Sequence, residues 1–133
     1  MKILILEDDE LRKELFRSKL STHELYITDN VEEFKKLLMG SKFDVLFLDH
    51  DLDGESYVPI DSTNTGSEAA RWLDQNREYI PDIIFLHTLN VVGQLNMKWL
   101  LPKAISAPYA WLRTKEDIES LIKQAQNRNG ALS

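Results

Sequence analysis

The chain has 133 residues, the size of one domain that buries roughly two-thirds of its unfolded surface without disulfides or metals. Its composition lacks the bias of disordered or fibrous chains, and the absence of cysteine excludes disulfides, thiolate metal sites and cysteine nucleophiles. A net charge of −6 opposes sequence-independent binding to duplex nucleic acid, whereas a divalent cation or a small phosphorylated ligand needs only a local site.

The first half of the chain alternates apolar runs with amphipathic segments. Lys2–Leu6 is nearly all apolar, as in a strand covered on both faces, and is too short for a signal peptide or a membrane span. Helical spacing of apolar residues predicts a helix over Glu10–Leu20, and His23–Thr28 predicts a second strand. A capping box opens a helix over Asn30–Gly40, and Phe43–Leu48 predicts a third strand. Because the first run directs neither export nor membrane insertion, we expect a cytoplasmic protein with no membrane partner.

The second half continues the alternation. Apolar spacing predicts a helix over about Gly66–Arg77, a strand over Ile83–Leu86 and a further helix over about Val91–Leu101. A weak fifth strand is predicted around Ala104–Ala107. A second capping box then opens a final amphipathic helix over Thr114–Gln126.

Strand and helix alternate about five times with no repeat or linker, which predicts an α/β fold. We expect a doubly wound, five-stranded parallel sheet with helices on both faces, formed by residues 1–126 as a single domain, and a frayed C-terminal tail over residues 127–133. Ligands of such sheets bind beyond the carboxyl ends of the strands, where the strand order reverses. The sequence does not indicate an oligomeric state.

Two predicted strands end in acids, because Glu7 and Asp8 follow the first strand and Asp49 follows the third. These runs resemble the response-regulator receiver family, which has a flavodoxin-like fold. The resemblance implies that Glu7 and Asp8 bind Mg²⁺ and that Asp49 accepts a phosphoryl group. If the two strands are neighbours, the three carboxylates converge and repel unless a cation such as Mg²⁺, Mn²⁺ or Ca²⁺ neutralises them. The alternative is that these acids only cap helices and turns.

The chain departs from the receiver pattern at the ends of its fourth and fifth strands. Receivers have a small hydroxyl residue at the first of these positions and a Lys-Pro pair at the second. Here His87-Thr88 follows the fourth strand, and Ala107-Pro108 is the nearest counterpart of the Lys-Pro pair. Unless Lys103 reaches in, the charge that pairs with a phosphorylated aspartate is missing.

Three further motifs follow the third and fourth strands, namely Asp49-His50-Asp51, Asn64-Thr65-Gly66 and His87-Thr88-Leu89-Asn90. From Met1 to about Leu101 the chain resembles the cyclic-phosphate processing receiver domain family, in which histidines accompany the receiver acids. The resemblance implies a small cyclic phosphate or cyclic nucleotide as the ligand.

His50 and His87 each come just after adjacent predicted strands, so we expect them to face one another across a pocket floored by the acids. Two imidazoles with a pKa of about 6.5 can divide the acid and base steps of phosphodiester cleavage. Asp49 is a third catalytic candidate, and Glu7, Asp8, Asp49 and Asp51 are the expected ligands of Mg²⁺ or Mn²⁺. Two other interpretations make the histidines metal ligands, which favours Mn²⁺, Fe²⁺ or Zn²⁺, or packed structural residues.

A phosphate site is predicted at the start of the third helix, where backbone N–H groups point outward. Its candidate residues are Asn64, Thr65 and Gly66, joined by Thr88 and Asn90 after the fourth strand. N-capping alone is the alternative. The long connection between Asp49 and this helix is also expected to be functional.

The sequence therefore predicts a divalent-metal-dependent phosphoesterase that acts on a small cyclic phosphate. One alternative is a signalling receiver phosphorylated on Asp49, which hydrolyses nothing. Another is a non-catalytic module that binds a phosphorylated ligand or a partner protein.

Overall fold

The computed structural model describes residues 1–52 and 63–132. Most of the long connection after Asp49, predicted to be functional, lies outside the described residues. The strands are β1 (Lys2–Leu6), β2 (Glu24–Thr28), β3 (Val45–Leu48), β4 (Ile83–Leu86) and β5 (Ile105–Ser106). The α-helices are α1 (Glu10–Lys19), α2 (Val31–Gly40), α3 (Gly66–Gln75), α4 (Val91–Leu100) and α5 (Lys115–Leu132). Two short 3₁₀ helices are η1 (Arg77–Tyr79) and η2 (Tyr109–Trp111).

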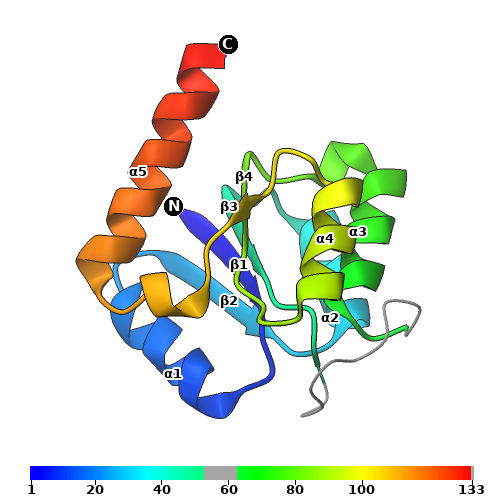
Figure 1. The fold of residues 1–133 in the computed structure, drawn as a ribbon, viewed down its shortest axis with the longest axis horizontal. Helices are drawn as coiled ribbons and strands as arrows, with labels where there is room; N and C mark the ends of the chain where they lie inside the picture. Colours follow the sequence, from blue (N-terminus) through cyan, green and yellow to red (C-terminus); the bar gives the residue numbers. More distant parts are fainter. Residues whose placement is uncertain (53–62, 133) are drawn as a thin grey trace.

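The five strands form one parallel sheet in the order β2-β1-β3-β4-β5. Helices α1 and α5 cover one face of the sheet, and α2, α3 and α4 cover the other (Figure 1). The predicted fold class is confirmed. The strand order reverses between β1 and β3, so the carboxyl ends of these strands border the expected ligand site.

Each strand sends alternate side chains into two separate cores. In β1, Leu4 and Leu6 join the core under α2, α3 and α4, whereas Ile3 and Ile5 join the core under α1 and α5. The last residues of three strands, Leu6, Leu48 and Leu86, are register partners across the sheet and all enter the first core. The next residue after each strand is therefore expected on the α1/α5 side.

Side-chain caps fix the starts of the helices near this edge. Asp9, Asn30, Thr65 and Asn90 are the N-caps of α1 to α4, and each side-chain oxygen accepts a hydrogen bond from a backbone N–H in the first turn. Such a cap stabilises a helix by about 1 kcal/mol. The capping residue Asn30, predicted from the sequence, is confirmed.

The C-terminal elements differ from the sequence prediction in length. Strand β5 has only two residues, Ile105 and Ser106, which pair with Phe85 and Leu86 of β4. Helix α5 continues past Gln126 to Leu132, where a frayed tail is expected; the segment after Gln126 has no proline to interrupt it. The division into a domain and a tail stays a prediction. Within the described residues, no helix combines the length and apolar character that a bilayer crossing requires.

Candidate functional site

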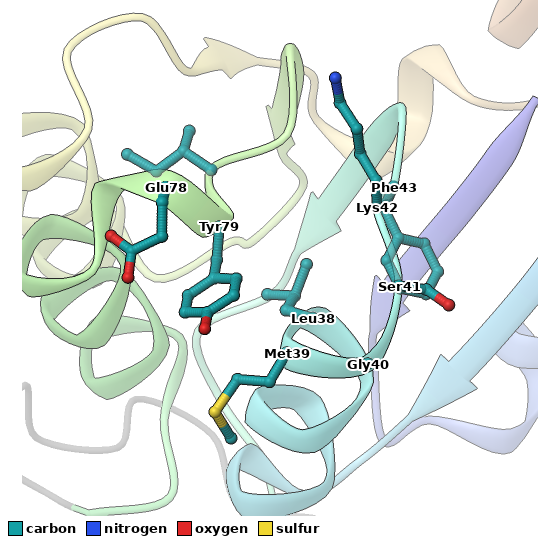
Figure 2. A pocket seen from close by; sticks show the side chains of 9 residues that line it. Leu38, Met39, Gly40, Ser41, Lys42, Phe43, Glu78 and Tyr79 are labelled. Carbon is teal, nitrogen blue, oxygen red and sulfur yellow. The ribbon is translucent and has the colours of Figure 1, made fainter.

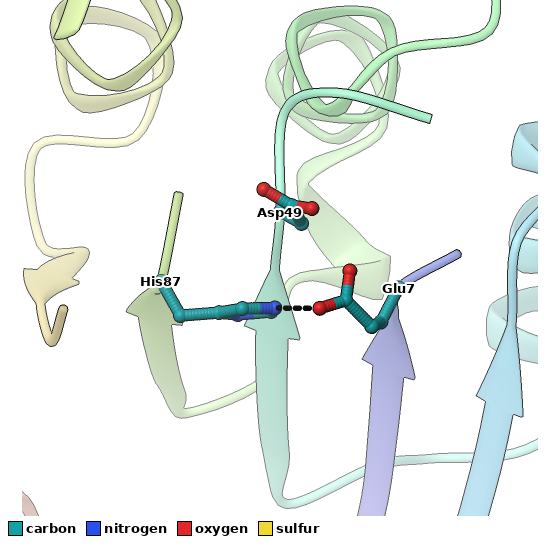
Figure 3. Close-up of side chains that lie close together, drawn as sticks. All are labelled: Glu7, Asp49 and His87. Atoms are coloured by element: carbon teal, nitrogen blue, oxygen red, sulfur yellow. Dashed lines mark ion pairs between the residues drawn. The ribbon is translucent and has the colours of Figure 1, made fainter. Parts of the chain in front are cut away.

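Three ionisable side chains meet at the carboxyl edge of the sheet. Glu7, Asp49 and His87 directly follow β1, β3 and β4. One ligand atom from each lies within 4.8 Å of those from the other two, and all three residues are buried (Figure 3). We call them the Glu7–Asp49–His87 cluster. The predicted convergence of Glu7 with Asp49 is confirmed, and His87 joins them.

The imidazole of His87 has no hydrogen-bond partner at either ring nitrogen among the described residues. Its Nε2 lies 3.7 Å from Glu7 Oε1, which is too far for a hydrogen bond. The ring packs against the rings of Phe16 and Phe47, with centroid distances of 5.4 and 6.3 Å. Buried polar atoms without a partner are costly, and a cation between His87 and Glu7 would supply one.

Burial shifts the pKa values of the carboxyl groups and of the imidazole in opposite directions. It raises the pKa of Asp49 to about 7, against a smaller opposing effect of His87. It also raises the pKa of Glu7 and lowers the pKa of His87 to about 4. At neutral pH His87 is therefore uncharged, with a lone pair available to a cation, and a cation would favour the deprotonated form of both acids.

Arg12 is a site residue that the sequence analysis missed. Its Nη1 donates to Glu7 Oε1 at 3.3 Å and lies 3.8 Å from Asp49 Oδ2. The backbone N–H of Arg12 donates to the capping Asp9 at 2.9 Å, which holds Arg12 in the first turn of α1 beside the end of β1. The available signal was the placement of an arginine in the first turn of a helix that follows an acid-terminated strand, a pattern that is common at ordinary helix starts.

Lys103 does not supply the missing receiver charge, because it lies at the opposite edge of the sheet. Its Nζ donates to the carbonyl oxygens of Pro81 at 2.7 Å and Asp82 at 3.3 Å, just before β4. After β5, the ring of Tyr109 instead lies 5.4 Å from the Arg12 guanidinium. Positive charge at the cluster therefore comes from α1 and not from the end of β5.

His50 lies between the N-terminal ends of α3 and α4. Its Nδ1 is 3.1 Å from Asp51 Oδ1 and 3.2 Å from Asn90 Nδ2. Gly66 N donates to the His50 carbonyl at 3.0 Å, and a Cβ added to Gly93 would lie 2.3 Å from Cγ of the His50 ring. The ring is buried and enclosed, with Nε2 as its unpartnered nitrogen. We call the side chains of His50, Asp51 and Asn90 the His50–Asp51–Asn90 group.

The prediction that His50 and His87 face one another is wrong. Leu48 and Leu86 are register partners, so His87 follows that register row by one residue and His50 by two. Because side chains alternate between the faces of a sheet, His87 lies on the α1/α5 side and His50 on the α3/α4 side. Among the described residues, no hydrogen bond, ion pair or ring contact joins the two imidazoles. Their catalytic roles stay predictions.

Two predicted metal ligands lie outside the cluster. Asp8 contributes its backbone N–H, which donates to Glu7 Oε2 at 3.1 Å. Asp51 Oδ1 accepts from Asn90 Nδ2 at 2.9 Å and contacts His50. Neither carboxylate belongs to the converging set of the described residues, so metal binding by Asp8 and Asp51 stays a prediction.

The five predicted phosphate ligands all have structural partners. Asn64 Oδ1 accepts from the first N–H of α2 at 3.0 Å, and Thr65 Oγ1 accepts from the α3 backbone at 3.1 Å. The Gly66 N–H donates to the backbone carbonyl of His50 at 3.0 Å. Thr88 Oγ1 accepts from the backbone N–H of Asn90 at 3.0 Å, and Asn90 caps α4. These contacts position helices, and phosphate binding by the five residues stays a prediction.

A family model described as the cyclic-phosphate processing receiver domain matches residues 2–103. The chain belongs to this family. The resemblance predicted from the acids and histidines is therefore confirmed, and the match ends just before β5. No curated protein shows significant similarity to the chain.

Solved structures with a receiver fold resemble this family member over nearly its whole length. The N-terminal domain of an uncharacterized protein from Wolinella succinogenes has a TM-score of 0.73 and 17% identity, covering 100% of this chain and 98% of its own. A receiver domain from Methanospirillum hungatei has a TM-score of 0.72 and 16% identity, with coverages of 99% and 98%. The response regulator TrrA from Thermotoga maritima, solved with Mg²⁺ and BeF, has a TM-score of 0.63 and 20% identity, with coverages of 94% and 99%. At these identities the likeness shows the fold.

The cluster of this receiver-like domain is suited to a metal ion. Two carboxylates and a neutral imidazole are a common ligand set for divalent metals. A bound cation would give Nε2 of His87 a partner, and it would lower the raised pKa values of Glu7 and Asp49.

A pocket elsewhere in the domain does not compete with this site. It has a volume of about 340 Å³ and lies between the end of α2 and η1, before β3 (Figure 2). The amino ends of the strands border it, at the edge opposite the cluster. Its lining offers one lysine and one glutamate and no histidine; the residues are Leu38, Met39, Gly40, Ser41, Lys42, Phe43, Glu78, Tyr79 and Ile80.

Proposed function

We propose that this protein hydrolyses a phosphodiester bond of a small cyclic phosphate or cyclic nucleotide, at the Glu7–Asp49–His87 cluster and with a divalent cation. The observation that carries the proposal is the convergence of three buried ligand groups within 4.8 Å at the ligand-binding edge of a receiver-like sheet. Membership of the cyclic-phosphate processing family supports the substrate class.

The ligand set supports Mn²⁺ as well as Mg²⁺. Glu7 and Asp49 offer oxygen, the donor that Mg²⁺ prefers, whereas the nitrogen of His87 favours a transition metal such as Mn²⁺. A bound divalent cation supplies positive charge that orients the phosphate and stabilises charge on its non-bridging oxygens.

His87 suits a role as a ligand or as a proton acceptor. Its pKa, lowered to about 4, leaves the ring uncharged at neutral pH, so it has little tendency to act as a proton donor. The expectation that two histidines share acid and base work thus assigns the donor role to His50.

The neighbours of His50 can orient its ring. Asp51 Oδ1 lies 3.1 Å from its Nδ1, and among the described residues its buried Nε2 has no hydrogen-bond partner. In the proposed reaction a water oxygen bonds to phosphorus, and one P–O bond within the cyclic phosphate of the substrate breaks. The leaving oxygen takes one proton, and the attacking water loses one.

A mass-spectrometric assay tests the proposal. The purified protein is incubated with Mg²⁺ or Mn²⁺ and a panel of 2′,3′-cyclic, 3′,5′-cyclic and cyclic-oligonucleotide substrates. We expect a linear phosphate product that is lost in Asp49→Asn and His87→Ala and reduced in His50→Ala. The matched control is His23→Gln, because His23 lies beside β2 and contacts Glu119 of α5 instead of the cluster. Absence of product from every substrate would contradict the proposal.

Phosphorylation of Asp49 is the second candidate, because Asp49 follows β3 as the acceptor of a receiver does, and Thr88 is near enough to lower the pKa of its carboxyl group in part. The raised pKa of Asp49 counts against it, and so does the pair Ala107-Pro108, which stands where a receiver has Lys-Pro. Incubation with acetyl phosphate and Mg²⁺ distinguishes the two. A stable phosphoryl adduct that is lost in Asp49→Asn, without hydrolysis of any cyclic substrate, would favour the signalling receiver.

A further inference from the structure

Arg12 connects the buried cluster with solvent. Its side chain is 28% exposed, whereas the side chains of Glu7 and Asp49 are 0% and 5% exposed. The guanidinium donates to Glu7 through Nη1, which uses one of its five N–H groups. Arg12 is therefore the cation through which an anion arriving from solvent can meet the cluster.

Tyr109 and Phe16 hold this guanidinium in place. The Tyr109 ring lies 5.4 Å from the guanidinium carbon, and the same ring makes an edge contact with Phe16 at 6.0 Å. A guanidinium over an aromatic face keeps its planar set of donors while its partners change. Arg12 can thus exchange one hydrogen-bond acceptor for another while its guanidinium stays over the Tyr109 ring.

A cation at the cluster would compete with Arg12 for the same oxygen. Glu7 Oε1 accepts from Arg12, and it is also the oxygen that lies 3.7 Å from His87 Nε2. A divalent ion held by the cluster would draw on that oxygen and would repel the guanidinium at short range. Metal binding therefore frees the donors of Arg12 for another acceptor beside the metal.

The fold leaves the usual receiver cation position empty of lysine. The pair after β5 is Ala107-Pro108, and Lys103 is bound to backbone carbonyls at the far edge. A phosphodiester presents two non-bridging oxygens, which match the paired N–H groups of one guanidinium. The cation required beside a bound phosphate is thus available from α1.

We propose that Arg12 binds the non-bridging oxygens of the substrate phosphate, after a divalent cation has displaced it from Glu7 and Asp49. This inference rests on the proposed function and names the residue that recognises the anionic phosphodiester.

Calorimetric titration of Arg12→Met with two probes tests it. For Mn²⁺ alone, we expect the variant to bind up to about fivefold more tightly than the original protein, because a competing ion pair is gone. For inorganic phosphate added to the Mn²⁺-loaded protein, we expect about 10- to 100-fold weaker binding, because a charge-assisted hydrogen-bond pair is lost. A merely structural Arg12 would not move the two affinities in opposite directions.

Arg12→Lys and Arg17→Met complete the set. The lysine keeps the charge without the planar fork, so phosphate affinity should recover in part. Arg17 lies in the same helix and pairs with Glu14 on the surface, so its loss should change neither affinity. Phosphate affinity unchanged in Arg12→Met, or Mn²⁺ affinity unchanged or lowered, would overturn the inference.

The inference and the proposed function fail in different ways. If the opposite shifts occur but no cyclic substrate is turned over, Arg12 is an anion-binding residue and the hydrolytic function is wrong. If cyclic substrates are hydrolysed and KM is unchanged in Arg12→Met, the hydrolytic function holds and the role of Arg12 is wrong.

Discussion

The two histidines beside the sheet edge occupy opposite kinds of environment. His87 is surrounded by Glu7, Asp49 and two aromatic rings, and neither ring nitrogen has a hydrogen-bond partner among the described residues. His50 contacts Asp51 and Asn90 and is pressed against a glycine of α4. Both nitrogens of the first ring lack a hydrogen-bond partner among the described residues, whereas Nδ1 of the second ring has two polar neighbours.

This difference separates a ligand site from the frame that supports it. The Glu7–Asp49–His87 cluster carries raised and lowered pKa values that a cation would relieve. The His50–Asp51–Asn90 group ties the β3 end to α4, and the backbone N–H of His50 donates to Asp49 Oδ1 at 2.8 Å. Asp49 belongs to both regions, because it accepts a hydrogen bond from His50 and is also one of the three candidate metal ligands.

Metal binding should show the largest contrast between the two histidines. We expect His87→Ala to weaken Mn²⁺ binding about 100-fold or more, because a ligand is lost. His50→Ala should weaken it by about tenfold at most, the lower end for a supporting residue, because the N–H donated to Asp49 belongs to the backbone and remains. Titration calorimetry measures both. Equal losses in the two variants would mean that His50 is a ligand as well.

The free energy of unfolding should depend on the packing of His50 against Gly93. A Cβ at this position would lie 2.3 Å from the His50 ring, so Gly93→Ala should lower the free energy of unfolding by about 1–3 kcal/mol. The double variant with His50→Ala should recover part of that loss, because the clash disappears. Urea unfolding provides the values, with Gly40→Ala as the control, since a Cβ there meets nothing within 4 Å. A loss of the same size with His50 absent would refute the clash.

The pH dependence of metal-free stability should sharpen the description of the cluster. The folded pKa of Asp49, raised from 3.8 to about 7, makes stability fall as the pH rises through this range. The folded pKa of His87, lowered from 6.5 to about 4, makes stability rise over nearly the same range. Folding moves one proton from the imidazole to the carboxyl group, so the two effects largely cancel between pH 4 and 6.5.

Replacing His87 by asparagine should remove that cancellation. Only the Asp49 contribution then remains, and the free energy of unfolding should fall by about 3 kcal/mol between pH 4 and 6.5 relative to the original protein. Denaturant unfolding at several pH values in the presence of a chelator tests this. A parallel pH profile in both proteins would show that the pair does not share a proton in this way.

The smallest effect is expected at Asn64, which was predicted to bind phosphate. Its side-chain oxygen accepts from the first N–H of α2 at 3.0 Å, so Asn64→Ala should cost about 0.5–1.5 kcal/mol of stability. We expect phosphate affinity in the presence of Mn²⁺ to stay unchanged. A clear loss of phosphate affinity at unchanged stability would instead support the prediction from the sequence.

Periodicity and local chemistry made most of the fold predictable from the sequence. Apolar runs such as Lys2–Leu6 and caps such as Asn30 act through neighbours in the chain, and both appear in the structure as expected. Sequence also placed Glu7 and Asp49 together, because the ends of adjacent parallel strands share one edge.

The errors have one physical source. The face of the sheet on which a side chain lies depends on strand register, which the sequence pattern does not give. His50 and His87 look equivalent as residues just after strands, but β3 and β4 end in the same register row, and a difference of one residue turns the side chain to the other face. The partnership of Arg12 with Glu7 was missed for a related reason. It depends on how α1 turns back over the end of β1, which helical spacing alone does not specify.

The shared row of Leu6, Leu48 and Leu86 has a consequence for engineering. Three single positions, one after each strand, supply the ligand groups of the edge. Any doubly wound scaffold whose three neighbouring strands stop in step could receive the same glutamate, aspartate and histidine as a graft. Conversely, inserting one residue between Leu6 and Glu7 would rotate the glutamate away and dismantle the site while leaving the sheet intact.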